Sequence, residues 1–298
     1  MTDNEIIDRL VSRRDALKII GTGVAAVLLQ SNTALAAEGG SGDKSVAMLY
    51  DATKCVGCRA CEAACNACNT QPLHEQGDHP CDLTPYNWTV VRQYQEGNEM
   101  SFRKYQCMHC EHPACVSVCP VQAMHKLDNG PVVYDPGKCI GCRYCMVACP
   151  FHVPRIDWSK PLPEVSKCNF CAKRIQEGLI PACAEACPMG ALSFGTRGEI
   201  LREAHSRIDQ NPDLYTDHVY GEGEGGGTGW MYLASVPFEA LGFPQLDSSP
   251  VSKTSEVVAQ YGTPGALIVV GAMLGGVRWM SRRWSIDPEG DLEHEEES

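Results

Sequence analysis

Cysteine spacing is the feature that most constrains this chain. Sixteen of its 18 cysteines fall into four groups of four, each opening with Cys-x2-Cys. Such groups are typical of metal ligation, because disulfide scaffolds are usually short chains with scattered cysteines. In chain order the motifs are Cys55-x2-Cys58-x2-Cys61-x3-Cys65, Cys107-x2-Cys110-x4-Cys115-x3-Cys119, Cys139-x2-Cys142-x2-Cys145-x3-Cys149 and Cys168-x2-Cys171-x11-Cys183-x3-Cys187.

The first and third motifs have the spacing that binds [4Fe–4S] clusters in two-cluster ferredoxins. Three thiolates two residues apart can wrap one face of a cubane in a tight loop that aims backbone N–H groups at the sulfurs. The fourth thiolate, three residues further along, points away and ligates the other cluster of a pair. Four motifs therefore predict two modules and four [4Fe–4S] clusters. Structural zinc is the alternative, although zinc sites seldom use this spacing.

Spacing alone does not decide which motifs pair. Residues 120–138, between motifs two and three, have the length of a strand-turn-strand connection, so we expect these motifs to form one module and motifs one and four to form a second that encloses it. Each expected ligand set is named here after its first cysteine. The sets are the Cys55 set (Cys55, Cys58, Cys61, Cys187), the Cys107 set (Cys107, Cys110, Cys115, Cys149), the Cys139 set (Cys139, Cys142, Cys145, Cys119) and the Cys168 set (Cys168, Cys171, Cys183, Cys65).

The N-terminus has the layout of a twin-arginine signal peptide, expected over residues 1–36. Arg13-Arg14 precedes an apolar stretch at 19–29 and an A-x-A site at Ala34-Leu35-Ala36. A basic amphipathic helix of the mature chain is the alternative, and the sequence does not show whether the segment is cleaved. Export of a folded, cofactor-loaded protein suits a chain whose thiols would otherwise oxidise.

An uncharged run near the other end, residues 257–277, predicts a single transmembrane helix. As a helix it would span roughly 30 Å, the thickness of a bilayer core. Arg278, Arg282 and Arg283 follow, so the positive-inside rule places the acidic tail, 278–298, in the cytoplasm and the cysteine domain on the periplasmic face of the cytoplasmic membrane. A buried or partner-bound hairpin is the alternative.

Between these segments we expect an α+β fold with two interleaved ferredoxin-like modules at 45–195 and an extension or docking segment at 196–256. The net charge of −12 argues against nucleic acid as a partner. No nucleophile, base and orienting group occur together, and no open metal site is evident. We therefore expect a non-catalytic electron carrier.

A dinucleotide-binding fingerprint, Gly221-x-Gly223-x-x-Gly226, is present but rejected. No strand is expected before it, residues 230–233 after it resemble a strand rather than a helix, and Glu222 and Glu224 would repel a pyrophosphate. A mobile loop or docking surface is the preferred interpretation.

Several residues near the motifs have open roles. Cys68 and Cys81 could form a disulfide after export or remain free, and His109 and His112 are expected to be structural or surface residues rather than ligands or proton relays. Cationic side chains could raise cluster potentials, with plain solvation an equal alternative. These cations are Lys54, Arg59, Arg143, Lys167 and Lys173.

Longer stretches around the cysteines resemble the four-cluster iron–sulfur subunits of membrane-bound respiratory oxidoreductases, and most of all the HybA-type subunit of hydrogenase-2. The resemblance implies electron transfer between a catalytic subunit and an integral membrane subunit that bears quinone or haem. The catalytic partner would be a NiFe hydrogenase or, alternatively, a molybdopterin enzyme such as formate dehydrogenase or a sulfur-compound reductase. The matching stretches are 48–51 with 55–58, 106–110, 115–120, 141–150, 194–197 and 224–228, and the likeness also supports the expected motif pairing.

Overall fold

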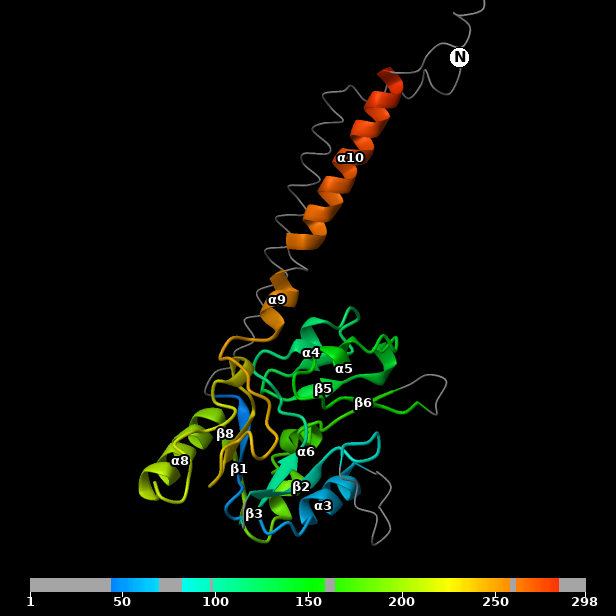
Figure 1. Cartoon of the computed structure of the whole chain (residues 1–298). Coiled ribbons are helices and arrows are strands. Elements are labelled where there is room, and N and C mark those ends of the chain that lie inside the picture. The colour runs from blue at the N-terminus through cyan, green and yellow to red at the C-terminus, as the bar shows by residue number, and fades with distance from the viewer. Residues whose placement is uncertain (1–43, 70–81, 97–98, 159–163, 258–260, 284–298) are drawn as a thin grey trace, which may run out of the picture. The chain divides into compact units, whose positions relative to one another are not determined.

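The computed structural model describes residues 44–69, 82–96, 99–158, 164–257 and 261–283 (Figure 1). The chain divides into two units, Met1–Lys253 and Thr254–Ser298, which are treated separately below. The expected signal peptide at 1–36, Cys81 and the tail from residue 284 onward lie outside the described residues.

The first unit mixes short strands and short helices, in agreement with the predicted mixture of helix and strand. Its strands are β1 (Val46–Asp51), β2 (Val90–Glu96), β3 (Glu99–Tyr105), β4 (Met124–Lys126), β5 (Val132–Tyr134), β6 (Arg155–Ile156), β7 (Val165–Ser166), β8 (Leu192–Thr196) and β9 (Trp230–Leu233). Its helices are α3 (Ala60–Cys68), α4 (Ala114–Ser117), η2 (Pro136–Lys138), α5 (Tyr144–Ala148), α6 (Ala172–Gln176), α7 (Ala182–Glu185), α8 (Arg197–Gln210) and η3 (Glu224–Gly226).

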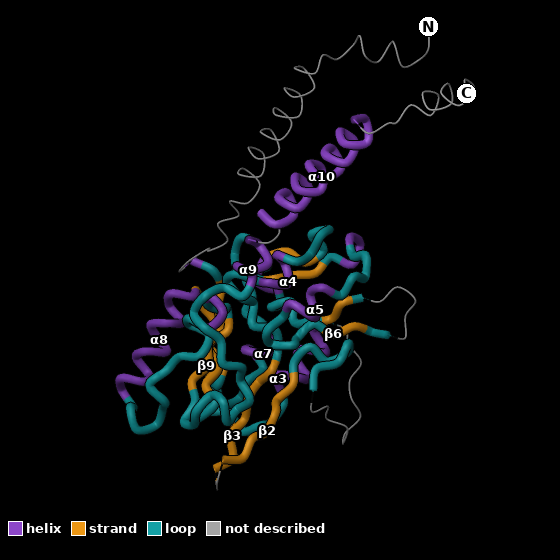
Figure 2. Tube along the Cα trace, turned by 45° about the horizontal axis from the view of Figure 1, so that its top comes forward, coloured by secondary structure: helices purple, strands orange, loops and turns teal. Residues whose placement is uncertain are grey.

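A three-stranded sheet with the order β8-β1-β9 joins distant parts of this unit (Figure 2). β1 pairs with β8 in antiparallel and with β9 in parallel orientation. Residues 230–233 therefore form a strand, as expected. The apolar residues of β9, which belong to the segment 196–256, are buried and complete this sheet.

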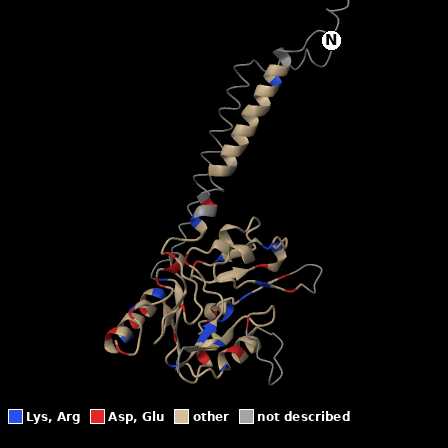
Figure 3. Cartoon of the chain, in the orientation of Figure 1, with Lys and Arg blue, Asp and Glu red and all other residues tan. Residues whose placement is uncertain are grey.

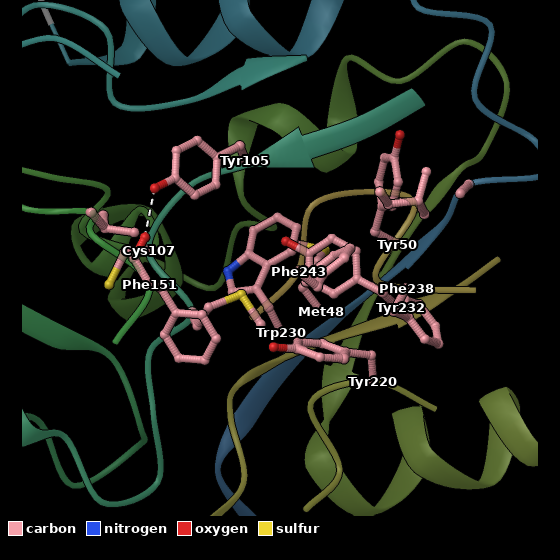
Figure 4. Close-up of a cluster of buried hydrophobic side chains, with 14 of the residues drawn as sticks. Met48, Tyr50, Tyr105, Cys107, Phe151, Tyr220, Trp230, Tyr232, Phe238 and Phe243 are labelled. Carbon is pink, nitrogen blue, oxygen red and sulfur yellow. Dashed lines mark hydrogen bonds between the residues drawn. The ribbon is translucent and has the colours of Figure 1, made fainter. Parts of the chain in front are cut away.

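Both faces of this sheet are buried, which explains why β1 and β9 are apolar at successive positions. Met48 and Tyr50 join Trp230 and Tyr232 in an aromatic core on one face (Figure 4). The alternate residues of the same strands face the other way and pack with α8. These residues are Ala47, Leu49, Met231 and Leu233.

Helix α8 covers one face of the sheet because its apolar residues recur at helical spacing. Ile200, Ala204 and Ile208 are buried at four-residue intervals and form one stripe. A capping box fixes the start of the helix: Thr196 Oγ1 accepts from the Glu199 N–H, and Glu199 Oε2 accepts from the Thr196 N–H at 2.9 Å. One face of the sheet thus packs against α8, and the other face packs against the aromatic core and the motif cysteines.

Two-stranded hairpins support the cysteine loops. β4 and β5 form an antiparallel hairpin between motifs two and three, which confirms the expected strand-turn-strand connection. β2 and β3 form a longer hairpin, and the Tyr105 hydroxyl at its end donates to the Phe151 carbonyl oxygen at 2.5 Å. This bond ties the hairpin to the end of motif three (Figure 4).

In the second unit, α10 (Thr263–Arg283) is long and apolar enough to span a membrane over Pro264–Ser281. Charged residues are sparse along α10 and frequent on α8 (Figure 3). Pro264 suits the first turn of α10, where its missing N–H costs no hydrogen bond. A short helix, α9 (Ser252–Val257), precedes it.

Asp51, at the end of β1, is the main polar connection between the sheet and α8. It is fully buried, and its Oδ2 accepts from Arg207 Nη1 and Tyr215 Oη, both at 2.9 Å. Asp51→Ala would remove both of these hydrogen bonds while Arg207 keeps its ion pair with Glu203, and we expect a loss of about 3 kcal/mol in the free energy of unfolding, because a hydrogen bond to a charged group contributes about 1.5–3 kcal/mol.

The matched control is Asp135→Ala. Asp135 also stands four residues before the first cysteine of its motif, but its side chain is 37% exposed; it caps η2 through the Gly137 N–H and lies 3.7 Å from the exposed Lys138 Nζ. Loss of such a cap costs about 1 kcal/mol. Denaturant unfolding of the cluster-loaded protein measures both variants, and equal losses would contradict the role assigned to Asp51.

Candidate iron–sulfur centres

The four motif loops share one backbone feature. The residue two positions after the first cysteine has a left-handed conformation in each motif, which turns the chain tightly enough to wrap a cluster. Glycine fills this position in motifs one and three, and a Cβ at Gly57 would lie 2.3 Å from the Phe102 ring. The four residues are Gly57 (φ 68), His109 (φ 48), Gly141 (φ 70) and Phe170 (φ 58).

Backbone N–H groups point at cysteine sulfurs, as the spacing predicts. In three motifs the N–H of that left-handed residue lies 3.4–3.5 Å from the Sγ of the first cysteine. The last cysteines of motifs two and four accept similarly from Met124 N at 3.5 Å and Ala191 N at 3.3 Å. Such donors stabilise negative charge on sulfur and raise the potential of a bound cluster.

One cavity brings together all four members of the Cys168 set. It is lined by Cys65, Cys168, Cys171 and Cys183, although Cys65 is more than 100 residues away from the others in sequence. Met48 and Trp230 of the central sheet and Lys104 of β3 form other parts of its wall. Helices α3 and α7, from motifs one and four, contact each other and bring these cysteines together.

A second cavity brings together the Cys139 set. Its lining contains Cys119 from motif two and Cys139, Cys142 and Cys145 from motif three. Helices α4 and α5, from the same two motifs, are in contact. Tyr134 of β5 also lines this cavity, and its hydroxyl is buried without a hydrogen-bond partner of ordinary geometry among the described residues.

The Cys107 set is gathered as well. Burial raises the pKa of Cys110 well above its usual value, and the neighbouring sulfurs that raise it further are Cys149, Cys107 and Cys115. The three cysteines whose charges most raise the pKa of Cys110 are thus the other three members of its expected set.

The Cys55 set is gathered less completely. Burial raises the pKa of Cys61 to about 12, and Cys55 is among its charged neighbours. Cys55, Cys61 and Cys187 pack against the same aromatic core, whereas Cys58 is exposed.

The donor set fits a polynuclear iron–sulfur group. Burial raises the pKa of cysteines in all four motifs, and adjacent sulfurs add to the effect, so free thiolates would be unfavourable here. Iron supplies the positive charge that makes buried thiolates stable. In the described part of the chain, no three Cys, His, Asp or Glu side chains converge on a point that could hold a single metal ion.

Among the residues near the motifs, Lys104 was missed by sequence reasoning, because it lies in β3 and not next to a cysteine. It is 1% exposed and lines the cavity of the Cys168 set. Lys167, which the sequence did single out, is also buried and donates to the carbonyl oxygens of Val132 and Cys168 at 2.5 and 3.1 Å. Lys54 and Lys173, in contrast, lie at the surface.

The two remaining arginines singled out have partners outside the cysteine sets. Arg59 lies 3.9 Å from Glu62, and the Arg143 guanidinium lies 4.2 Å from the ring centre of Trp158. Arg143 also borders the cavity of the Cys139 set, but from the exposed side.

His109 has a structural position, as expected. Its Nδ1 accepts from the Val132 N–H at 3.0 Å, and its ring packs edge-on against Phe170 with centroids 4.7 Å apart. Burial lowers its pKa well below the usual value, and nearby lysines lower it further, so the ring is neutral. His112 is exposed.

The glycine-rich loop has no phosphate-binding geometry. The Gly221 N–H donates to Glu224 Oε2 at 2.7 Å, and Arg197 Nη2 donates to the Glu222 carbonyl oxygen at 2.7 Å. The loop leads into strand β9 and not into a helix, in line with the rejected fingerprint.

Cys68 has an exposed, free thiol that contacts Cys171 of the Cys168 set. It does not line the cavity, whereas Cys171 does. We therefore expect Cys171→Ala to lose up to about four iron atoms, the content of one cluster. Cys68→Ala should retain its iron. Iron analysis of the two purified variants provides the comparison, and equal iron loss would show that Cys68 is a ligand.

Comparison with known proteins agrees with this geometry. Residues 43–123 and 98–197 each match a 4Fe-4S dicluster domain. A protein of Nitratidesulfovibrio vulgaris is 46% identical over 78% of this chain. The aligned part covers 66% of that protein's own length. The hydrogenase-2 operon protein HybA of Escherichia coli O157:H7 is 38% identical over 80% of this chain and 84% of its own length.

The iron–sulfur subunit of the nitrate-inducible formate dehydrogenase of Escherichia coli K12 is 40% identical over 63% of this chain and 67% of its own length. All sixteen motif cysteines lie within the residues that match the two dicluster domains. The chain therefore belongs to the family of 4Fe–4S dicluster iron–sulfur subunits of oxidoreductase complexes.

Proposed function

We propose that the chain binds four [4Fe–4S] clusters through its sixteen motif cysteines and carries electrons between two partner subunits. The cavities lined by the Cys139 and Cys168 sets are the observation that most supports this assignment, because each contains one cysteine from the partner motif. The two modules would then be interleaved, with motifs two and three enclosed by motifs one and four.

The electrostatic neighbours of the cysteines support a linear order for the sets. Cys61 of the Cys55 set interacts with Cys183 of the Cys168 set, and Cys168 interacts with Cys107. At the next junction Cys115 of the Cys107 set interacts with Cys145 of the Cys139 set. The order would be the Cys55, Cys168, Cys107 and Cys139 sets.

Exposure supports the same order. All sixteen motif cysteines lie in the described part of the chain, and only Cys58 and Cys142 among them are exposed. Cys58 belongs to the first set of the proposed order and Cys142 to the last. Single electrons would therefore enter at one exposed end and leave at the other, while the two inner sets stay shielded from water.

A bound [4Fe–4S] cluster supplies a one-electron carrier whose potential depends on burial, charge and hydrogen bonds to sulfur. The chain itself supplies the sulfurs, the N–H donors of the motif loops and the packing that excludes solvent. Bond chemistry would belong to a catalytic partner subunit.

The preferred catalytic partner is a NiFe hydrogenase, because the match to HybA covers more of this chain than the match to the formate dehydrogenase subunit, 80% against 63%. A molybdopterin enzyme is the second candidate. The other partner would be an integral membrane subunit that bears quinone or haem.

Export and anchoring complete the proposal. The twin-arginine segment at 1–36 would export the loaded protein, and α10 would anchor it on the periplasmic side of the cytoplasmic membrane. Because Arg278 lies near the C-terminal end of the candidate span, its long side chain can extend toward the membrane surface.

Metal analysis tests the cluster assignment. The full chain, purified anaerobically, is expected to contain about 16 iron atoms with an equal amount of acid-labile sulfide, four per cluster. Zinc in place of iron, or fewer than about twelve iron atoms, would contradict four clusters. In the intact complex, nickel would identify the hydrogenase partner and molybdenum the second candidate.

Membrane topology tests the localisation. A reporter fused after Ser298 should be located in the cytoplasm, because the arginines that end α10 remain on the cytoplasmic side. Changing Arg13-Arg14 to Lys-Lys should keep the cysteine domain in the cytoplasm as well, whereas the wild-type domain should be accessible to protease added to spheroplasts. A reporter found outside the cytoplasm would contradict the orientation.

A further inference from the structure

Lys104 has a buried ammonium group with only neutral hydrogen-bond partners. Its Nζ donates to Thr89 Oγ1 at 2.6 Å and to Gln106 Oε1 at 3.3 Å, and it lies 4.7 Å from the ring centre of Trp230. Within the described ranges it makes no ion pair with an acidic residue. A buried charge is unfavourable unless an opposite charge accompanies it.

The groups whose negative charge acts most strongly on Lys104 are cysteine sulfurs. Lys104 lines the same cavity as Cys65, Cys168 and Cys183. The sulfurs that interact with its charge include these three and Cys61, which belongs to the Cys55 set. Lys104 therefore lies between the first two sets of the proposed order, and its counter-charge would come from the thiolates that hold a cluster.

We propose that Lys104 is a positioning residue for electron transfer, whose fixed positive charge raises the reduction potential of the cluster held by the Cys168 set and, to a smaller extent, of the cluster held by the Cys55 set. The inference rests on the proposed function. Reduction adds one negative charge to a cluster without making or breaking a covalent bond, so a nearby cation stabilises the reduced form.

Burial is what gives Lys104 this effect. A charge in a low-dielectric interior interacts more strongly than one in water, where solvent and salt screen it. Lys173 provides the comparison within the same set, because it lies two residues after Cys171 but is exposed. Thr89 and Gln106 fix the position of the Lys104 ammonium group, and both are buried themselves.

The experiment is an anaerobic redox titration of the full chain, followed by electron paramagnetic resonance. Lys104→Met is expected to shift at least one cluster's reduction equilibrium tenfold toward the oxidised form, which is about 59 mV for one electron. Lys104→Arg keeps the charge and should stay close to wild type. Lys173→Met is the matched control and should leave all midpoints unchanged.

Iron analysis of each variant separates the possible failures. A wild-type protein without four clusters would refute the proposed function before any potential is compared. Unchanged midpoints in a fully loaded Lys104→Met protein would overturn the inference and leave the proposed function intact, as would equal shifts in Lys104→Met and Lys173→Met.

Lys104→Gln is the second neutral variant, in case Lys104→Met loses iron. If Lys104→Gln retains its iron, its midpoint potentials test the inference in the same way as those of Lys104→Met. Iron loss in both neutral variants with retention in Lys104→Arg would support the inference, because the positive charge would then be required to hold the clusters. Iron loss in all three variants would overturn it, because the shape of the lysine rather than its charge would matter.

Discussion

The packing of many sulfurs in a solvent-poor interior is the constraint on which the rest of this structure depends. Thiolates crowded together repel one another, and burial makes each of them harder to ionise. The helices around them, α4, α5, α6 and α7, have only four or five residues each and could not persist alone. Metal binding would therefore contribute directly to folding in these modules, as it does in small metal-bound domains.

A conventional hydrophobic framework holds the two modules in place. The sheet β8-β1-β9 is covered by α8 on one face and by aromatic side chains on the other. Met48 and Trp230 extend from this sheet to the wall of a cysteine cavity. The same residues thus pack in the hydrophobic core and against the cysteines, so a substitution in the sheet would also change the shape of the cysteine cavity.

The motif spacing predicted the loop geometry, the hydrogen bonds to sulfur and the short hairpin between motifs two and three, because all of these are local. The sequence did not show that β9 would pair with β1, or that Lys104 would line a cysteine cavity. These contacts join segments far apart in the chain, and no local periodicity encodes them. Two aspartates at the same position of their motifs also differ in burial, which the motif pattern does not show. Asp51 is buried and bonded to Arg207 of α8, whereas Asp135 caps a turn near solvent.

The parallel pairing of β1 with β9 has a consequence for biosynthesis. Met48 lies beside Trp230, about 180 residues later in the chain, so a ribosome must produce most of the protein before the sheet can close. Contacts of such long sequence separation form slowly. The first motif would therefore wait, with its thiols open, until the strand that shields it has emerged.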